Sequence, residues 1–154
     1  MTRGAWAVGA GCVALAVAYA IGSPGAGAGT GKSVIRISDR QTKLTYVDQG
    51  RKGRGVGDLE LIRLSLYNTR ITKRPIGRGD VVCIRLGGSR RSCTATYSLP
   101  RGKLVVAGTV ASRLLSEAPV VGGTGLYDNA RGSLVTTATS VTPRREILVF
   151  RLVG

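Results

Sequence analysis

The sequence predicts an all-β fold: a small antiparallel β-barrel of eight strands, preceded by a signal peptide. About eight short runs of β-favouring residues follow one another at spacings of roughly ten to fifteen residues. No amphipathic helical pattern separates these runs, and parallel strands would need longer crossover connections. The Thr-rich final third also favours strands, because β-branched side chains suit a pleated surface. Antiparallel strands of this number are typical of barrels and sandwiches.

The first residues have the order of a secretory signal peptide. Arg3 supplies a positive start, Ala5–Ile21 contains no charged residue, and small residues lead to Ala26-Gly27-Ala28. We therefore expect residues 1–28 to be removed and the mature chain to be secreted. The alternative is an uncleaved leader that anchors the protein in a membrane, since the apolar run is close to the shortest that spans a bilayer.

The mature chain is expected to form one barrel domain with two parts. Residues 29–57 contain two short strands, Ser33–Ser38 and Lys43–Asp48, and a Gly-rich basic loop that runs to Asp58. Residues 58–154 form the main barrel region. Its predicted strands are Leu59–Asn68, Asp80–Leu86, Ser92–Leu99, Lys103–Ser112, Ala130–Ser140 and Glu146–Val153, with Val120 and Val121 leading into a cluster of glycines.

The only cysteines of the mature chain are expected to form a disulfide. Cys83 and Cys93 each lie five residues from Gly88, at the centre of a predicted hairpin. A symmetric hairpin register places the two residues directly opposite each other, where cross-strand separations match disulfide geometry. An even cysteine count also fits an oxidising compartment.

Charge and composition exclude several functions. The chain contains no His, which rules out Ser-His-Asp and Cys-His catalysis and His-ligated zinc. Its formal net charge of +15 predicts attraction to anionic polymers or surfaces. The basic residues are spread over many predicted turns, and few aromatic side chains are available for stacking on bases. The sequence therefore argues against specific nucleic-acid recognition but is compatible with non-specific binding of polyanions.

Three segments carry the motifs of a known family. Gly122–Gly132 contains Gly-Gly-Thr-Gly, then an aromatic residue, then Ala-Arg-Gly. Leu66-Tyr67-Asn68 is similar to a Leu-Tyr-Asp strand end, and Cys93–Gly102 is similar to a Cys-x-Gly-x-Phe-x-Leu-Pro-x-Gly hairpin, with Ala95 at the usual Gly. In this order, the segments resemble the allene oxide cyclase-like and dirigent-like barrels, over Asp58–Val153.

The resemblance implies a barrel with an apolar lumen that binds a small molecule. Allene oxide cyclases hold a reactive epoxide in one conformation and exclude water, and dirigent proteins steer the coupling of phenoxy radicals. We therefore expect an apolar or phenolic ligand, with no cofactor and no metal, and a homo-oligomer is a state to test. The alternatives are an isomerase or cyclase on the same barrel, and a non-catalytic envelope-associated protein that binds anionic polymers.

Candidate site residues follow from the predicted strands and the motif. Four polar side chains are candidates for orienting a ligand: Tyr46, Asp58, Arg85 and Tyr97. Without His, proton transfer would fall to Asp58 or to a tyrosine. The motif residues that we expect to brace a turn are Gly122, Gly123, Thr124, Gly125, Tyr127, Arg131 and Gly132.

For the predicted strand Asp80–Leu86, the sequence does not decide which face points into the barrel. Val82, Ile84 and Leu86 form a uniformly apolar set, and they alternate with the mixed set Val81, Cys83 and Arg85. Small barrels normally turn the apolar set inwards, whereas a ligand cavity admits a few polar groups.

Overall fold

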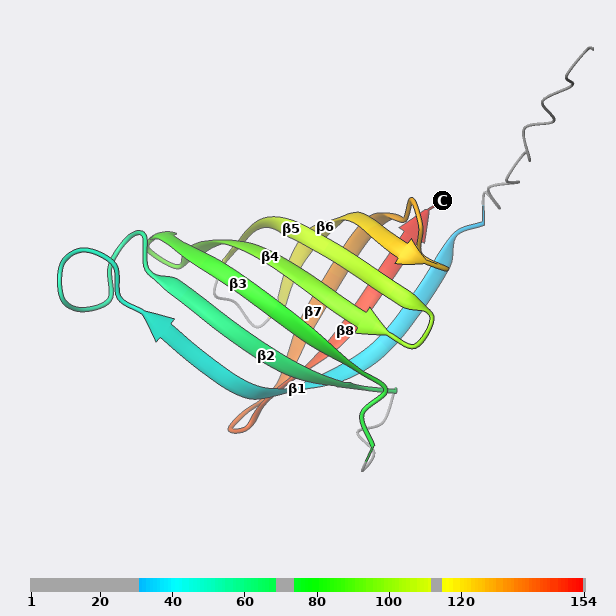
Figure 1. Cartoon of the computed structure of the whole chain (residues 1–154), viewed down its shortest axis with the longest axis horizontal. Coiled ribbons are helices and arrows are strands. Elements are labelled where there is room, and N and C mark those ends of the chain that lie inside the picture. The colour runs from blue at the N-terminus through cyan, green and yellow to red at the C-terminus, as the bar shows by residue number, and fades with distance from the viewer. Residues whose placement is uncertain (1–30, 69–73, 112–114, 154) are drawn as a thin grey trace, which may run out of the picture.

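The computed structural model describes residues 31–68, 74–111 and 115–153, which form a closed antiparallel barrel (Figure 1). Each strand pairs with its neighbours in sequence, and the last strand closes the barrel on the first. The strands are β1 (Ser33–Val47), β2 (Leu59–Tyr67), β3 (Gly77–Gly87), β4 (Arg90–Leu99), β5 (Gly102–Ala111), β6 (Leu115–Gly125), β7 (Arg131–Val141) and β8 (Arg144–Val153). The predicted eight-stranded antiparallel barrel is confirmed.

The proposed signal peptide and its cleavage site lie outside the described residues. Within the described residues, no helix is long and apolar enough to cross a membrane.

The two short strands predicted at the start of the domain are one long strand. β1 pairs with β8 through its first half and with β2 through its second half, and its register with β2 shifts between Gln41 and Lys43. A bulge of this kind adds one residue to a strand and bends it without ending its pairing. The polar run between Ser38 and Lys43 therefore bends the strand where the sequence indicated a break.

The glycine cluster belongs to a strand, which corrects the prediction of a turn at Gly122–Gly125. These four residues end β6, and the chain reverses over the next four, where Asn129 has a positive φ of 59°. Gly123 is required by a close backbone approach, since a Cβ there would lie 2.1 Å from the carbonyl oxygen of Tyr127. Glycine thus lets the turn fold back onto the end of its own strand.

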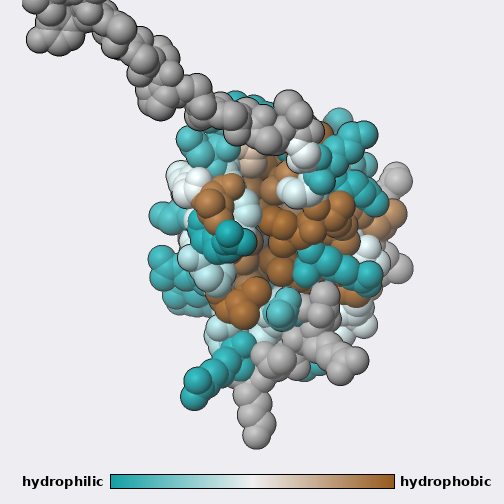
Figure 2. All heavy atoms as spheres, turned by 90° about the vertical axis from the view of Figure 1, so that its right-hand side faces the viewer, coloured by the Kyte–Doolittle hydropathy of each residue, from teal (hydrophilic) through white to brown (hydrophobic). Residues whose placement is uncertain are grey.

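Inward side chains fill one half of the barrel. Leu66, Leu104 and Phe150 are completely buried, and the rings of Tyr97 and Phe150 meet edge to face with centroids 5.2 Å apart. The end face on this side lies near the start of β1 and the end of β8, and Figure 2 shows apolar side chains gathered on it. Val34 and Val153 are exposed apolar residues of these strand ends.

The mixed face of β3 points inwards and the apolar face points outwards. Val82, Ile84 and Leu86 are 45%, 44% and 41% exposed, whereas Cys83 is buried and Val81 is half-buried. On β2, Leu61 pairs with Val82 and is also exposed. The inward positions are therefore taken by a disulfide and an ion pair, which makes the lumen more polar than a simple hydrophobic core.

Candidate ligand-binding site in the barrel lumen

The unfilled half of the lumen is a cavity of about 320 Å³. For comparison, a cavity of roughly 150 Å³ is enough to bind benzene in an engineered protein. The apolar part of the wall comes from strands all around the barrel: Leu44, Ile62, Leu64, Val81, Ala95, Val106, Val110, Ala118 and Leu134. The cavity therefore has the size and lining of a site for one small molecule that combines apolar and polar groups.

The cavity opens at one end of the barrel. Its outer lining comes from Tyr46 near the end of β1, Arg91 near the start of β4, and Ala111 at the end of β5. Ser116 near the start of β6 and Arg144 at the start of β8 complete this rim. Strands that alternate in direction bring all these positions to the same end, opposite the filled half.

The predicted disulfide is present, and it lines the cavity. Cys83 and Cys93 are register partners on β3 and β4, with their Cα atoms 4.0 Å apart and their sulfurs bonded. Both residues contribute to the cavity wall. The cross-link therefore fixes two neighbouring strands where they enclose the ligand space.

Asp39 is the most unusual polar group in the lumen. Its side chain is only 1% exposed, and Oδ1 accepts a hydrogen bond from the backbone N–H of Glu146 at 2.9 Å. Oδ2 is buried and has no hydrogen-bond partner among the described residues. Burial, together with the neighbouring Glu146 carboxylate, raises the pKa of Asp39 to about 7. At neutral pH, the group is therefore able to donate or accept a proton.

Tyr97 lies at the inner end of the same cavity. Its side chain lines the wall and is almost fully buried, and the ring has room because position 79 is glycine, where a Cβ would lie 3.3 Å from the Tyr97 ring. Burial and the nearby carboxylates of Asp39 and Glu146 raise the pKa of the Tyr97 phenol, so it stays protonated. A neutral phenol next to Asp39 provides a hydrogen-bond donor at the bottom of the cavity.

A buried carboxylate holds two arginines near the mouth. Glu60 lines the cavity, and Arg91 Nη1 donates to its Oε2 at 2.7 Å while Arg85 Nη1 donates to its Oε1 at 3.4 Å. Glu60 has a side-chain exposure of 5%. Burying this charge is tolerable because both of its oxygens are paired.

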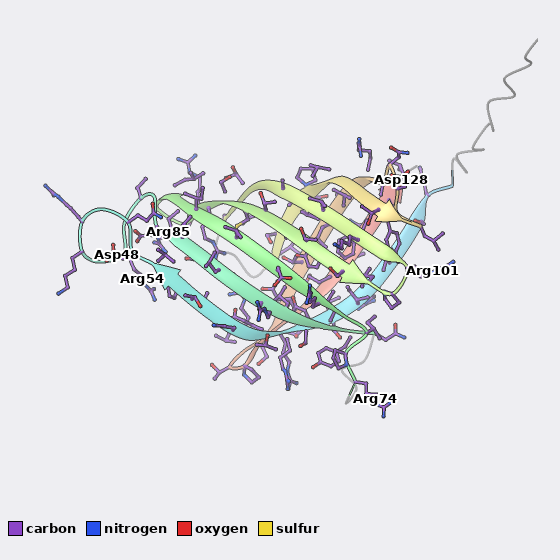
Figure 3. The ribbon with its side chains drawn as sticks, in the orientation of Figure 1. Asp48, Arg54, Arg74, Arg85, Arg101 and Asp128 are labelled. Carbon is purple, nitrogen blue, oxygen red and sulfur yellow. A yellow bond between two sulfur atoms is a disulfide. The ribbon has the colours of Figure 1, made fainter. Side chains whose placement is uncertain are left out.

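The four sequence candidates fall into two groups. Tyr46 and Tyr97 line the cavity, whereas Asp58 and Arg85 are not among its lining residues. Tyr46 lies at the mouth and is 45% exposed, and the Arg54 guanidinium sits over its ring, 4.7 Å from the centroid. Figure 3 shows Arg54 and Arg85 at this end of the barrel and Arg101 at the other end.

Asp58 organises a loop. Its carboxylate accepts hydrogen bonds from the backbone N–H groups of Gln49, at 3.0 Å, and Gly55, at 2.6 Å. These bonds lower the pKa of Asp58 below its usual value. A carboxylate held in this way stays ionised and serves the loop, whereas the carboxyl groups of Asp39, Glu60 and Glu146 line the cavity.

The family-motif residues lie away from the cavity wall. The turn after β6 is closed by a hydrogen bond from the backbone N–H of Tyr127 to the carbonyl oxygen of Thr124, at 3.2 Å. Arg131 Nη1 donates to the carbonyl oxygen of Ala130 at 3.0 Å. None of the motif residues between Gly122 and Gly132 lines the cavity.

Sequence reasoning missed the residues Asp39, Glu60, Arg91 and Glu146. A local signal was present for the first of them: Ile35, Ile37 and Asp39 alternate along one strand, so the carboxyl group shares the face of two apolar side chains. The hydrogen-bond partner of Asp39 is Glu146, which lies 107 residues later in the sequence, and no local pattern identifies it. Within the described part of the chain, no cluster of three or more His, Cys, Asp or Glu side chains is placed to hold a metal ion.

Comparisons with known proteins identify the architecture. No protein-family model matches the chain, and no curated protein matches it by sequence. A pyocyanin demethylase structure superposes with a TM-score of 0.64 at 19% identity, covering 75% of this chain and 98% of that one. A pterocarpan synthase dirigent protein superposes with a TM-score of 0.64 at 14% identity, covering 79% of this chain and 83% of the dirigent chain.

A third similar solved structure is that of a Diels-Alderase. The Diels-Alderase AbmU from Streptomyces koyangensis superposes with a TM-score of 0.64 at 19% identity, covering 84% of this chain and 72% of that one. Identities this low establish shared architecture and leave function open. The chain has the eight-stranded barrel fold of dirigent and Diels-Alderase proteins, the fold that its family resemblance implied.

Proposed function

We propose that this protein is a secreted barrel that binds one apolar or phenolic small molecule in its lumen and restricts its conformation or coupling. The observation that carries the proposal is the half-filled lumen: Tyr97, whose ring packs edge to face against the buried Phe150, lines a cavity of about 320 Å³. A barrel that served only as a scaffold would gain stability by filling this space, because a cavity costs packing energy.

The distribution of polar groups supports a ligand with an oxygen atom at its inner end. Asp39 and Tyr97 both line the cavity, with Tyr97 at its inner end, and each can donate a hydrogen bond at neutral pH. The rest of the wall combines apolar side chains, such as Ile62, Val81 and Ala95, with polar groups. Such a site would hold a phenolic or carbonyl compound in one orientation, and confinement would then select the geometry that reacts.

The solved structures with this fold are consistent with such a role. They include a pyocyanin demethylase, a pterocarpan synthase dirigent protein and a heme-binding cyclase that catalyses a [4 + 2] cycloaddition. Secretion is supported by the Cys83–Cys93 disulfide, because disulfides persist in oxidising compartments. The leader at residues 1–28 supports the same localisation.

Thermal stabilisation by candidate ligands tests the proposal. A compound that binds the folded state alone must raise the unfolding temperature. We expect at least one compound in a panel of phenolics, polyenes and fatty-acid epoxides to do so. Ala95→Phe, which places a ring in the cavity wall, should abolish the shift. Thr94→Phe, on the exposed face of the same strand, is the matched control and should preserve it. No shift with any compound would refute the proposal.

A second candidate function is an isomerase or cyclase on the same barrel, and Asp39 favours it. A carboxyl group with a pKa of about 7 is matched to proton transfer at neutral pH. If the protein turns over a bound ligand, Asp39→Asn should lower kcat far more than it weakens binding. An activity unchanged in this variant would leave confinement as the mechanism.

A further inference from the structure

The two ion-pair clusters in the cavity wall differ in net charge. Glu146 is paired with Arg144 alone, and a single carboxylate oxygen accepts from the Arg144 guanidinium. Glu60 is shared by Arg85 and Arg91, which leaves that cluster with one positive charge in excess. The excess lies where Arg91 enters the wall of the cavity.

Arg91 has unused hydrogen-bonding capacity. Its side chain is 19% exposed, and only Nη1 bonds to Glu60. The Nε–H is buried and has no hydrogen-bond partner among the described residues. A guanidinium offers five N–H donors in a planar fork, and the edge formed by Nε and the second amino group matches a carboxylate or sulfonate. An unpaired buried donor is costly, so an anion that satisfied it would bind favourably.

We propose that the ligand carries an anionic group, a carboxylate or sulfonate, which docks on Arg91 at the mouth of the cavity. This inference rests on the proposed small-molecule function and adds the ligand's charge and orientation. The net charge of +15 favours the same class of ligand, because it draws anions towards the protein.

The geometry of β4 sets the orientation of such a ligand. Arg91, Cys93, Ala95 and Tyr97 alternate along one strand, and all four line the cavity. Six residues of β-strand span about 20 Å. The anionic end would therefore lie at the mouth, the apolar body would pack along Cys93 and Ala95, and the inner end would approach Tyr97.

Two fluorescent probes with a common aromatic skeleton test this proposal. The anionic probe is 1-anilinonaphthalene-8-sulfonate, and the uncharged probe is N-phenyl-1-naphthylamine, which lacks the sulfonate. We expect the unmodified protein to bind the sulfonate probe about tenfold or more tightly, as a charge-assisted hydrogen bond would give. Arg91→Gln should remove most of this preference, because it should weaken binding of the sulfonate probe far more than binding of the uncharged probe.

Matched variants separate the lumen from the surface. Arg90→Gln removes the same charge from an exposed neighbouring position and should preserve the preference. Arg91→Gln leaves Glu60 paired with Arg85, so the barrel is expected to fold, and Arg91→Lys provides a second variant that keeps the charge and loses the fork. Ala95→Phe should weaken binding of both probes.

The outcomes distinguish this inference from the function on which it rests. Equal affinity of the unmodified protein for both probes would overturn the anion site and leave a lumen that binds uncharged molecules. Sulfonate binding that survives Ala95→Phe would place the anion on the basic exterior and would also overturn the inference. Failure of both probes to bind, together with an inactive ligand panel, would refute the proposed function itself.

Discussion

Asp39 on β1 and Glu146 on β8 lie directly opposite each other, and the backbone N–H of Glu146 donates a hydrogen bond to Oδ1 of Asp39 at 2.9 Å. The two residues are 107 positions apart in sequence. Both residues line the cavity, so a buried carboxyl group has a second carboxyl group as its neighbour. Like charges in such a place favour a proton on one of them.

Removing the charge of Glu146 should lower the pKa of Asp39. In Glu146→Gln the backbone hydrogen bond remains while the repulsion disappears, so the value should fall below about 7 yet stay above that of an exposed aspartate because burial persists. Carbon NMR titration of the Asp39 carboxyl group measures it. The control is Glu117→Gln on the exposed face of β6. An unchanged Asp39 titration would show that burial alone sets its pKa.

Asp39 should make the protein less stable as pH rises. The folded state keeps the Asp39 proton up to about pH 7, whereas the unfolded chain releases it near pH 3.8. Because the folded state binds more protons in this range, its free energy of unfolding falls as pH increases. The contribution lost is on the order of 4 kcal/mol. Urea unfolding measures the free energy of unfolding of the wild type and of Asp39→Asn. The difference between the two values should shrink or change sign as pH rises across this range. A difference independent of pH would contradict the raised pKa.

The Cys83–Cys93 disulfide should stabilise the barrel. It closes a loop of 10 residues, for which chain entropy predicts roughly 2–3 kcal/mol. Unfolding in urea with and without reductant measures this contribution. The double variant with alanine at both positions should be less stable and insensitive to reductant. Alkylation of two thiols in the native, unreduced mature protein would show that the bond is absent.

Asp58→Asn should loosen the loop between β1 and β2 without affecting the cavity. The neutral amide accepts the Gln49 and Gly55 N–H groups less strongly than the carboxylate, so hydrogen exchange at these two amides should accelerate. Asp48→Asn, which loses one charged bond to Gly53, is the matched control for the same loop. If Asp58→Asn reduces ligand-induced stabilisation as much as Asp39→Asn does, Asp58 takes part in ligand binding.

The basic loop should bind anionic polymers. Arg51, Lys52 and Arg54 lie in the exposed loop at the mouth end of the barrel. Counterion release makes such binding weaken steeply with salt, and each lost contact reduces the slope by roughly one unit. Replacing all three residues by Ser should lower the salt concentration that elutes the protein from heparin. Elution at an unchanged salt concentration would show that this loop does not bind anionic polymers.

The fold could be predicted because its signals are local. Alternation, turn residues and the hairpin around Gly88 are readable in short windows, and they placed most strands and the Cys83–Cys93 pair. The break predicted within β1 was wrong because a polar run normally marks a turn. Here, Asp39 within that run is buried in the lumen.

The site was harder to predict because it depends on contacts across the barrel. The inward face of β3 follows from closure of the sheet, which buries Cys83 and exposes Ile84. Similarly, Glu60 is tolerable in the interior because Arg85 and Arg91, 25 and 31 residues later, pair with its two carboxylate oxygens. Asp58 was predicted as a site residue because it is an acidic residue beside a strand. Its hydrogen bonds instead go to nearby backbone N–H groups and hold a loop.

The filled floor of the lumen has a kinetic consequence. Within the described residues, the cavity has its entrance at the rim that carries Tyr46 and Arg144, so incoming and outgoing molecules share one route. If the protein converts its ligand, the product must depart before the next reactant arrives, and the product's dissociation rate sets a ceiling on turnover. Accumulated product would then act as a competitive inhibitor, and a pre-steady-state burst followed by slower steady turnover would reveal it.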